Sequence, residues 1–409
     1  MRSEAMRIAI LGAGGTGVCA ALELANRGYS VDLYEEKAQP LTGASRNNEG
    51  KIHLGLVYAK DRSLATAKTM IQGAIHFSAY LNRWIDPGSS APLISTPFYY
   101  AVPKDTMTEP ADLERHYDEC RRLFDEACAA TGLSYLGQHR LLVEKVSEDE
   151  LEGVFSPEHI QCVYRTSEVA VDVRGIADRL SDAVRCNPRI RFLACARVLG
   201  VKPEAKGTLR VTFRAGENEH TEVYDQVANT LWHGRLEIDA TAGLVPERDW
   251  IYRYKVGGWL NRPVEPGIPS VTFVLGPFGD TVNLGSRGLY FSWYPLGMLG
   301  TSSELKPPER WGELEDSKLR SILRGSYQAL GKLCPALNTV KYDEELVDAA
   351  AGVIFAWGAA DIDEHGSRLH TRYEIGIHSE GNYHSVNTGK YTMVPLLGYQ
   401  TAERILGIS

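Results

Sequence analysis

The sequence predicts an α/β protein of two domains, and three observations support this class. The chain has 409 residues, which is more than one domain usually holds. Residues 7–35 follow the pattern strand, glycine-rich turn, helix and second strand. Further along, β-branched and aromatic runs at 270–275 and 289–294 are bounded by Gly and Pro, which indicates additional strands.

Composition excludes several classes of function. Hydrophobic residues make up 44% and charged residues 23%, as in a globular protein with a large core. The net charge is −8 and no basic run occurs, so nucleic acid is not an expected partner. Seven cysteines without a C-x-x-C pair predict reduced thiols, no metal site and a cytoplasmic location. The longest apolar stretch, 8–25, contains four glycines and Glu23, so no membrane span is expected.

The strongest motif lies near the N-terminus. An apolar run, Arg7 to Leu11, is typical of a buried parallel strand. It leads directly into G-A-G-G-T-G, which satisfies G-x-G-x-x-G, and then into a helical pattern from Val18 to Arg27 that Gly28 ends. The predicted contacts of this turn with a cofactor involve Gly12, Gly14, Gly15, Thr16 and Gly17.

Each part of the motif has a physical reason. Gly12 permits the tight turn, Gly14 lets the backbone approach a pyrophosphate, and Gly17 lets the helix pack closely on the strand. The helix N-terminus supplies N–H groups and positive dipole. Glu35, 23 residues after Gly12, and its neighbour Glu36 follow the second strand, where an acid accepts hydrogen bonds from ribose hydroxyls. Such an acid disfavours NADP; NAD, FAD and a plain glycine turn stay open at this point.

The next segment favours FAD over NAD. Residues 42–56 (T-G-A-S-R-N-N-E-G-K-I-H-L-G-L) are small and polar where an NAD domain normally continues into a helix. Here the chain resembles the D-amino-acid-oxidase-like (DAO) superfamily of FAD-dependent oxidoreductases, with features like 2-hydroxyglutarate dehydrogenase and FAD-dependent glycerol-3-phosphate dehydrogenase. The resemblance implies non-covalent FAD, with Ser45 and Arg46 on the pyrophosphate side. It also implies that Lys51, Ile52, His53 and Leu54 approach the isoalloxazine ring.

Four later segments agree with this resemblance. Residues 169–180 look like a strand that leads through Asp172 into an amphipathic helix. Val198 resembles a valine beside the adenine, and Asn229 and Thr230 resemble a turn against the phosphates. The C-terminal T-G-K-Y-T resembles the last cofactor-binding loop, with Pro395 in the first turn of a helix directed at the flavin. The residues that this loop contributes are Thr388, Gly389, Lys390, Tyr391 and Thr392.

The resemblance also implies the domain organisation. A Rossmann-type, glutathione-reductase-like FAD-binding domain is expected from residues 1–85, 166–245 and 345–409. Residues 86–165 and 246–344 are expected to form a substrate domain, an inserted antiparallel β-sheet plus helix. That helix is predicted by apolar residues at helical spacing between Pro110 and Gly132, and a turn is predicted at 276–280.

Several residues are candidates for chemistry. His53 stands where the family chain passes the flavin, and it is a flavin neighbour, a covalent attachment point or a core histidine. The resemblance places Lys390 beside the pyrimidine end of the flavin, with a solvated loop lysine as the alternative, and His384 faces either substrate or surface. An arginine that binds a carboxylate is expected for an acid substrate. The anchoring candidates are Arg253, Lys255, Arg287 and Tyr290, with Lys255 alternatively activating oxygen.

The expected function is therefore an FAD-dependent oxidoreductase that takes a hydride from a C–N or C–O bond of a small molecule. Amino acids or amines and hydroxy acids or polyols remain equal alternatives as substrates, and oxygen or another acceptor reoxidises the flavin. A redox-neutral flavoprotein or a non-enzymatic binding protein on the same fold is the alternative. The G-H-G-type signature of many amine oxidases is absent, which favours dehydrogenase-type relatives.

Overall fold

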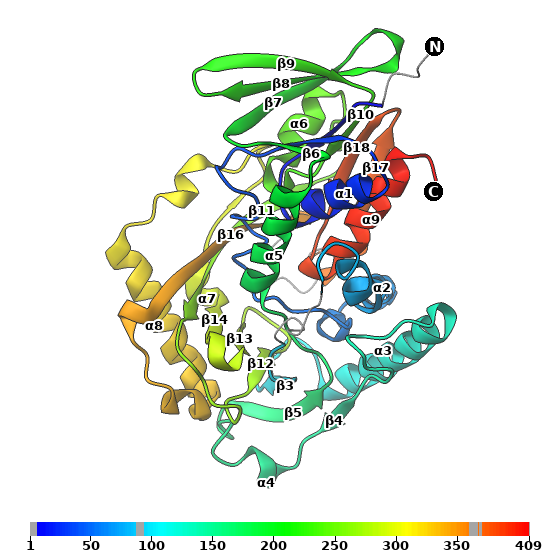
Figure 1. The fold of residues 1–409 in the computed structure, drawn as a ribbon. Helices are drawn as coiled ribbons and strands as arrows, with labels where there is room; N and C mark the ends of the chain where they lie inside the picture. Colours follow the sequence, from blue (N-terminus) through cyan, green and yellow to red (C-terminus); the bar gives the residue numbers. More distant parts are fainter. Residues whose placement is uncertain (1–5, 87–93, 360–366, 368–369, 409) are drawn as a thin grey trace.

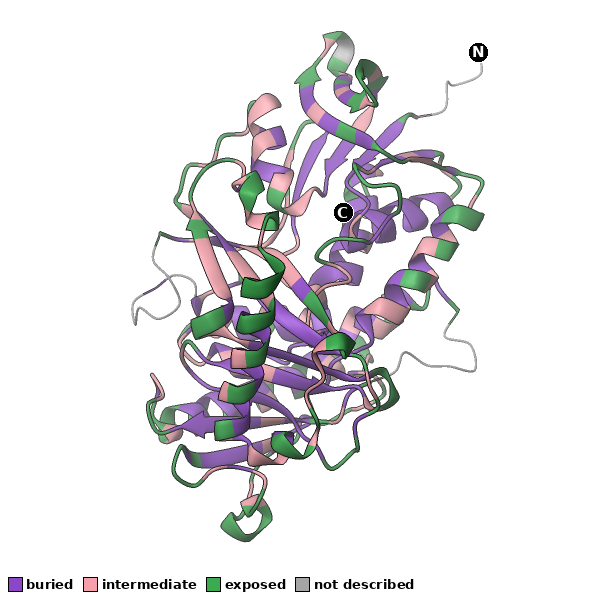
Figure 2. Cartoon of the chain, turned by 90° about the vertical axis from the view of Figure 1, so that its left-hand side faces the viewer, coloured by how far each residue is buried: buried purple, intermediate pink, exposed green. Residues whose placement is uncertain are grey.

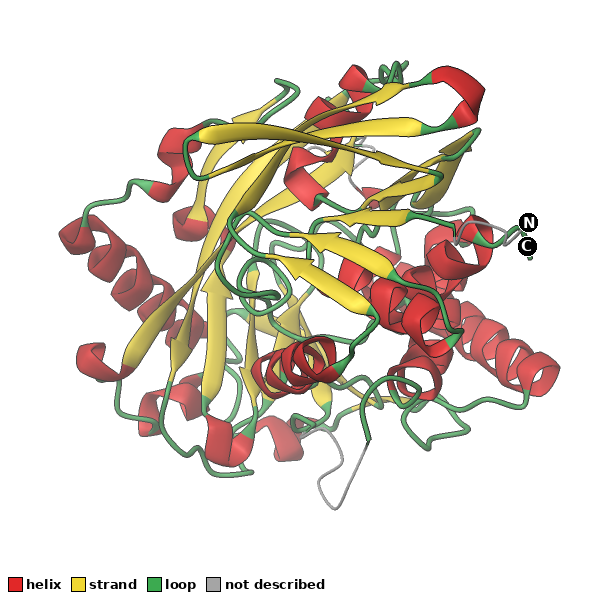
Figure 3. Ribbon diagram, turned by 45° about the horizontal axis from the view of Figure 1, so that its top comes forward, coloured by secondary structure: helices red, strands yellow, loops and turns green. Residues whose placement is uncertain are grey.

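The computed structural model describes residues 6–86, 94–359, 367 and 370–408. Small parts of the predicted segments 1–85, 86–165 and 345–409 therefore lie outside the described residues, namely 1–5, 87–93, 360–366, 368–369 and 409. The described chain contains three sheets, with the helices arranged around them (Figures 1 and 3). No helix among the described residues is long and apolar enough to cross a membrane.

The first sheet has six strands in the order β17-β18-β10-β1-β2-β6, and only β17 runs antiparallel to its neighbour. Its strands come from distant parts of the chain: Ile8–Leu11, Val31–Tyr34, Ile190–Leu193, Gln226–Asn229, Gly376–Glu380 and Tyr383–Asn387. Every residue of β1 is buried because the sheet is covered on both faces. Ile8 and Ile10 pack in the cluster that includes α1 (Gly15–Asn26) and α5 (Val173–Cys186). Ala9 and Leu11 face the opposite layer.

That opposite layer is the three-stranded sheet β7-β8-β9 together with α6 (Arg235–Thr241). Its strands are Ala196–Pro203, Leu209–Ala215 and Asn218–Tyr224, and they project at the top of Figure 1. On the helical side, α1 packs against α9 (Val394–Ile405) so closely that a Cβ on Gly398 would lie 2.4 Å from Cys19 Cβ. The predicted strand–glycine turn–helix–strand unit is therefore present.

The third sheet has nine strands. Eight of them follow the order β15-β11-β14-β13-β12-β3-β5-β4, and the ninth, β16, pairs with β11 along its whole length. The sheet is antiparallel apart from the β12–β3 pair. Helix α8 (Asp316–Leu333) packs on one side of it, and α2 (Ala65–Leu81) and α3 (Pro110–Thr131) belong to the cluster on the other. The interior strands are buried and α8 exposes its outer face (Figure 2). The strands are Phe98–Pro103, Val143–Lys145, Ile160–Thr166, Trp250–Leu260, Ser270–Phe273, Gly279–Asn283, Leu289–Trp293, Met298–Ser302 and Val347–Trp357.

Two differences from the expected organisation concern strands. The predicted turn at 276–280 overlaps the start of β13, because the connection from β12 to β13 reverses direction within Val274 to Phe278. Residues 347–357, expected in the cofactor domain, form β16 and pair along their whole length with β11 of the nine-stranded sheet. We therefore propose that the last cofactor-binding segment begins after Trp357.

Candidate functional site

The glycine turn after β1 is fixed by close backbone contacts. Gly12 has φ +95, a left-handed conformation that glycine adopts without strain. A Cβ on Gly17 would lie 2.0 Å from the Gly12 carbonyl oxygen, so only glycine fits where α1 crosses β1. The Thr230 hydroxyl donates to the carbonyls of Leu11 (2.8 Å) and Gly12 (2.9 Å), and it thereby joins the end of β10 to the turn.

The N-terminus of α1 is available to an anion. Its first residue follows Gly14, which offers no side-chain cap. A Cβ on Gly14 would meet only Ser45 Oγ, at 3.7 Å, and that hydroxyl accepts from the Gly15 N–H at 2.7 Å. Thr16 Oγ1 lies 2.7 Å from Thr388 Oγ1 of the C-terminal loop. The turn, the 45–50 segment and the C-terminal loop thus meet where the helix dipole favours a phosphate.

Of the two acids after β2, only Glu35 faces this turn. Its carboxylate accepts from the N–H of Ala13 (3.1 Å) and of Lys37 (3.0 Å). Burial raises the pKa of Glu35, while these two backbone donors oppose the increase. Glu36 is exposed and lies 3.6 Å from Lys37. Glu35 could therefore accept a ribose hydroxyl, whereas Glu36 faces solvent.

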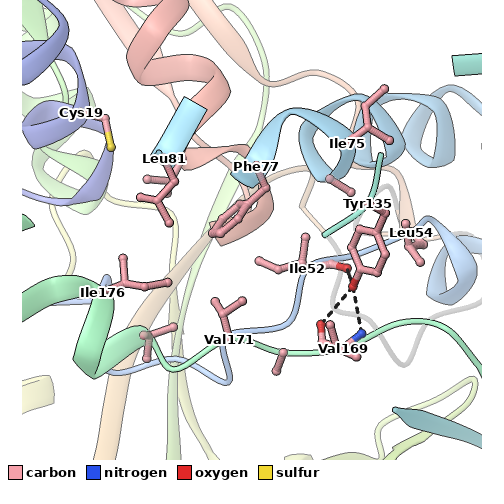
Figure 4. Close-up of a cluster of buried hydrophobic side chains, with 14 of the residues drawn as sticks. Cys19, Ile52, Leu54, Ile75, Phe77, Leu81, Tyr135, Val169, Val171 and Ile176 are labelled. Atoms are coloured by element: carbon pink, nitrogen blue, oxygen red, sulfur yellow. Dashed lines mark hydrogen bonds between the residues drawn. The ribbon is translucent and has the colours of Figure 1, made fainter. Parts of the chain in front are cut away.

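The segment 51–54 alternates between the core and the interior of the site. Ile52 and Leu54 point into the apolar cluster beneath α2 (Figure 4). The Tyr135 hydroxyl fixes this layer: it donates to the carbonyls of Ile52 (3.1 Å) and Val169 (3.3 Å), and it accepts from the Val169 N–H (2.9 Å). Because side chains alternate along an extended chain, Lys51 and His53 face the other way.

Lys51 is buried against the nine-stranded sheet. Its ammonium donates to Thr272 Oγ1, lies 3.9 Å from Asp280 Oδ2 and lies 4.2 Å from the centre of the Phe98 ring. A charged lysine in this position needs such partners. Lys51 therefore joins the 51–54 segment to β12, β13 and β3.

His53 is buried beside a buried acid. Its backbone N–H donates to Thr392 Oγ1 (2.9 Å), but neither ring nitrogen has a hydrogen-bond partner. Nδ1 lies 3.8 Å from Glu168 Oε1. Burial lowers the pKa of His53 far below its usual range, and Lys390 and Lys51 add to this effect, so the ring is neutral. Two unpaired buried nitrogens indicate a group that the protein alone does not satisfy.

Four ionisable side chains, Glu49, Lys255, Tyr294 and Lys390, form an electrostatic cluster next to His53. Each is enclosed enough for burial to act on its pKa, yet each keeps accessible surface. The ammonium of Lys255 lies 4.5 Å from the centre of the Tyr294 ring.

The charges in this cluster support one another. Burial opposes ionisation of Glu49, but Lys390, Lys255 and Lys51 hold the pKa of that carboxyl below its usual range. Burial opposes the charge of Lys255 as well, yet the neighbouring tyrosines, Asp280 and Glu49 raise its pKa. Burial lowers the pKa of Lys390, against the attraction of Glu49. Glu49 is therefore an ionised carboxylate near three lysines, and Arg253 and Arg372 add positive charge near Tyr294.

The C-terminal loop closes the site. Gly389 has φ +68, and a Cβ there would lie 2.5 Å from Ile375 Cγ2. The buried Thr392 accepts from the His53 N–H and donates to the Lys51 carbonyl at 3.3 Å. Tyr391 packs on Phe77, with ring centres 5.8 Å apart. Pro395 lies in the first turn of α9, as predicted.

Several predicted site residues have other neighbours. Arg46 donates to Asp178 on α5 at 2.5 Å, and Arg287 donates to Asp172, the N-cap of α5, at 2.9 Å. Both ring nitrogens of His384 are bonded, to Ser379 (2.8 Å) and Gln226 (2.9 Å). Of the other candidates, Asn229 bonds Asp239 and Tyr383, Val198 on β7 packs with the first sheet, and Tyr290 and Arg253 are buried on β14 and β11 beside Lys255 and Tyr294. The roles of these four residues stay predictions.

Three residues of the site were missed by sequence reasoning. Glu49 lies within the marked segment 42–56, Glu168 directly precedes the marked segment 169–180, and Asp280 lies in the predicted turn. A signal for Glu49 existed, because it is the only acidic residue of that segment. No local signal marks Glu168 or Asp280, whose role depends on contacts across the fold.

These features fit a long dinucleotide with an aromatic head group. The uncapped helix N-terminus and the open face of Gly14 suit a pyrophosphate, and Glu35 suits a ribose. The unpaired nitrogens of His53 and the accessible surface of Glu49 and Lys390 suit a polar ring system at the far end. No group of three metal-ligating side chains occurs in the described part of the chain. The fold and site define a dinucleotide-dependent enzyme.

Comparison with known proteins identifies the family. The model of the DAO family, FAD dependent oxidoreductase, matches residues 7–404. The chain therefore belongs to the FAD-dependent oxidoreductases of the DAO family, and FAD is its cofactor. Among curated proteins no sequence matches it.

Solved structures share the fold at low identity. Glycine oxidase from Geobacillus kaustophilus has a TM-score of 0.70 at 14% identity, over 99% of this chain and 96% of that one. Iminodiacetate oxidase from a Chelativorans species has a TM-score of 0.68 at 13% identity, over 98% and 96% of the two chains. L-α-Glycerophosphate oxidase from Mycoplasma pneumoniae, with FAD bound, has 0.66 at 14%, over 99% and 95%.

Proposed function

We propose that this enzyme binds FAD non-covalently across the first sheet. Glu35 would accept the ribose hydroxyls, and the backbone from Gly12 to Gly17, with Ser45, would hold the pyrophosphate. The flavin would lie among the 49–54 segment, the 388–392 loop and Lys255. Support comes from the open helix N-terminus and from the enclosed but accessible side chains described above. Bound FAD supplies the acceptor for two electrons and a hydride.

We further propose that the substrate is a small amino acid in its zwitterionic form. The observation that carries this proposal is Glu49 held ionised by the charges of Lys390, Lys255 and Lys51. Two ammonium groups suit a substrate carboxylate, and one carboxylate suits a substrate ammonium. Tyr294 beside Lys255 adds a phenol that can donate to the carboxylate.

Hydroxy compounds, the alternative substrate class, fit the same charges less well. A phosphate dianion, such as glycerophosphate, would bring about two negative charges against Glu49 and would offer that carboxylate only neutral hydroxyl donors. A hydroxy acid would leave Glu49 with a neutral hydroxyl donor. Glycine oxidase and iminodiacetate oxidase act on amine substrates, in agreement with the amino-acid assignment, whereas glycerophosphate oxidase acts on an alcohol.

Anaerobic mixing of the FAD-loaded enzyme with substrates tests the proposal. Glycine, proline and iminodiacetate would represent the amino acids, and lactate and glycerol 3-phosphate the hydroxy compounds. Bleaching of the flavin band by an amino acid is expected. Bleaching by the hydroxy compounds alone would refute the substrate class.

Variants of two carboxylates sharpen this test. Glu49→Gln removes the partner of the ammonium, and a lost charge-assisted hydrogen bond of about 1.5–3 kcal/mol predicts a fall of roughly 10–100-fold in kcat/KM for amino acids. Glu36→Gln changes an exposed carboxylate and serves as the matched control. Equal activity of Glu49→Gln and Glu36→Gln would show that Glu49 does not bind substrate.

A further inference from the structure

The unpaired ring of His53 calls for an explanation beyond cofactor contact. The residue is 4% exposed, and both ring nitrogens lack partners. Leaving a buried donor or acceptor unpaired costs about 1–3 kcal/mol, and folded proteins tolerate this mainly where function requires it. By contrast, the nearby buried His116 bonds the Gly55 carbonyl through Nε2 at 3.0 Å.

The carboxylate beside His53 is held rigidly. Glu168 is fully buried, and it accepts from the Leu54 N–H and from the Tyr100 hydroxyl, each at 2.6 Å. Its Oε1 lies 3.8 Å from His53 Nδ1, just beyond hydrogen-bond distance. The tautomer with hydrogen on Nδ1 faces this carboxylate and leaves Nε2 as an acceptor.

Charged and titratable groups from every neighbouring element face this pair. Lys51 comes from the same segment, and Lys390 comes from the C-terminal loop. The others are phenols and one thiol whose pKa values burial raises, so they are neutral near pH 7: Tyr58, Tyr100, Tyr117, Cys120 and Tyr135. Burial also raises the pKa of Glu168, although Lys51 opposes the increase. The pKa of His53 is therefore lowered and that of Glu168 raised, which brings the two values closer together.

Oxidation of an amine requires a proton acceptor. The hydride that leaves the substrate carbon carries both electrons of the broken C–H bond to the cofactor, and the carbon–nitrogen bond becomes an imine. One proton from the substrate nitrogen must then leave separately. Glu49 is a weak acceptor, because two lysines stabilise its ionised form. His53 has an unpaired acceptor nitrogen and a carboxylate 3.8 Å from its other nitrogen, and negative charge on the reduced cofactor would raise its proton affinity.

We propose that His53 accepts this proton at Nε2 and that Glu168 is the positioning residue that stabilises the imidazolium through Nδ1–H. This inference rests on the proposed function, because it requires the flavin beside His53. Negative charge that remains on the cofactor after two-electron reduction raises the proton affinity of the ring. The pair thus couples reduction of the cofactor to uptake of one proton.

The test measures protons and needs no substrate. The midpoint potential of the FAD-loaded enzyme is measured between pH 6 and 9, and its slope gives the number of protons taken up per two electrons. Wild-type enzyme is expected to take up two protons and His53→Gln one. His116→Gln, a change in a buried histidine that already has a partner, is expected to take up two.

Glu168→Gln provides a second test that leaves the imidazole in place. Loss of the counter-charge makes the imidazolium less stable. The pH at which proton uptake per two electrons falls from two to one is therefore expected to be lower than in the wild-type enzyme. Equal slopes for wild type, His53→Gln and Glu168→Gln would overturn the proton role while leaving FAD binding intact. A wild-type protein that binds no FAD would overturn the proposed function and this inference together.

Discussion

Gly14 and Gly17 belong to the same turn, but we expect their substitution to have different effects, on cofactor binding and on folding respectively. At Gly17 an added Cβ would lie 2.0 Å from the Gly12 oxygen and 2.5 Å from Thr230 Oγ1. Neither β1 nor α1 can move without disturbing buried layers on both faces of the sheet. At Gly14 an added Cβ would meet only Ser45 Oγ at 3.7 Å, and φ is −73, a value that alanine adopts freely. Gly17→Ala thus perturbs the protein, and Gly14→Ala perturbs only what binds there.

The expected magnitudes differ accordingly. Overpacking costs about 1–3 kcal/mol, and loss of the Thr230 hydrogen bond adds about 1 kcal/mol, so Gly17→Ala should destabilise the apoprotein by roughly 2–4 kcal/mol. Gly14→Ala should change apoprotein stability by less than about 1 kcal/mol, the range of N-cap substitutions. Its methyl group occupies the path of the pyrophosphate, so FAD affinity should fall at least about 10-fold, or 1.4 kcal/mol.

Urea unfolding of the two apoproteins gives the first quantity, and quenching of flavin fluorescence during titration gives the second. Gly43→Ala, at an exposed glycine with nothing within 4 Å of an added Cβ, is the control. Wild-type FAD affinity in Gly14→Ala would refute the placement of the pyrophosphate at this turn.

Three further predictions concern buried polar groups. Glu23→Gln should destabilise the protein by about 3 kcal/mol in urea unfolding, because the fully buried carboxylate accepts from Trp84 Nε1 (3.0 Å) and Arg83 (2.7 Å); no loss would contradict this. Burial lowers the pKa of His53, so below about pH 6.5 the unfolded chain binds a proton that the folded chain does not. Apoprotein stability should therefore fall as pH drops through that value, and less steeply in His53→Gln; parallel curves would contradict a buried neutral ring. Thr392→Val leaves the His53 N–H unpaired and should lower apoprotein stability by about 1–3 kcal/mol, whereas an unchanged unfolding midpoint would contradict this.

The sequence predicted local features well because their causes are local. The turn from Gly12 to Gly17, the helix that ends before Gly132 and the helix that begins around Pro395 each depend on residues within a few positions. Glycine at positive φ and proline in a first helical turn leave a signal in the sequence itself.

The substrate region could not be predicted in the same way. Glu49, Lys255 and Lys390 come from three distant segments, and their charges acquire meaning only when the sheets bring them together. Arg287 was a reasonable anchor by residue type, but it is committed to the N-cap of α5. Residues 347–357, which form β16, were assigned to the cofactor domain by their position in the chain, whereas their pairing with β11 is a long-range property.

The proposed function depends most on anaerobic titration of the FAD-loaded enzyme with amino acids, followed by the flavin absorbance. Complete bleaching by an amino acid is expected, with a loss of that response of at least about 10-fold in Glu49→Gln. A protein that binds no FAD, or a flavin that only hydroxy compounds reduce, would contradict it.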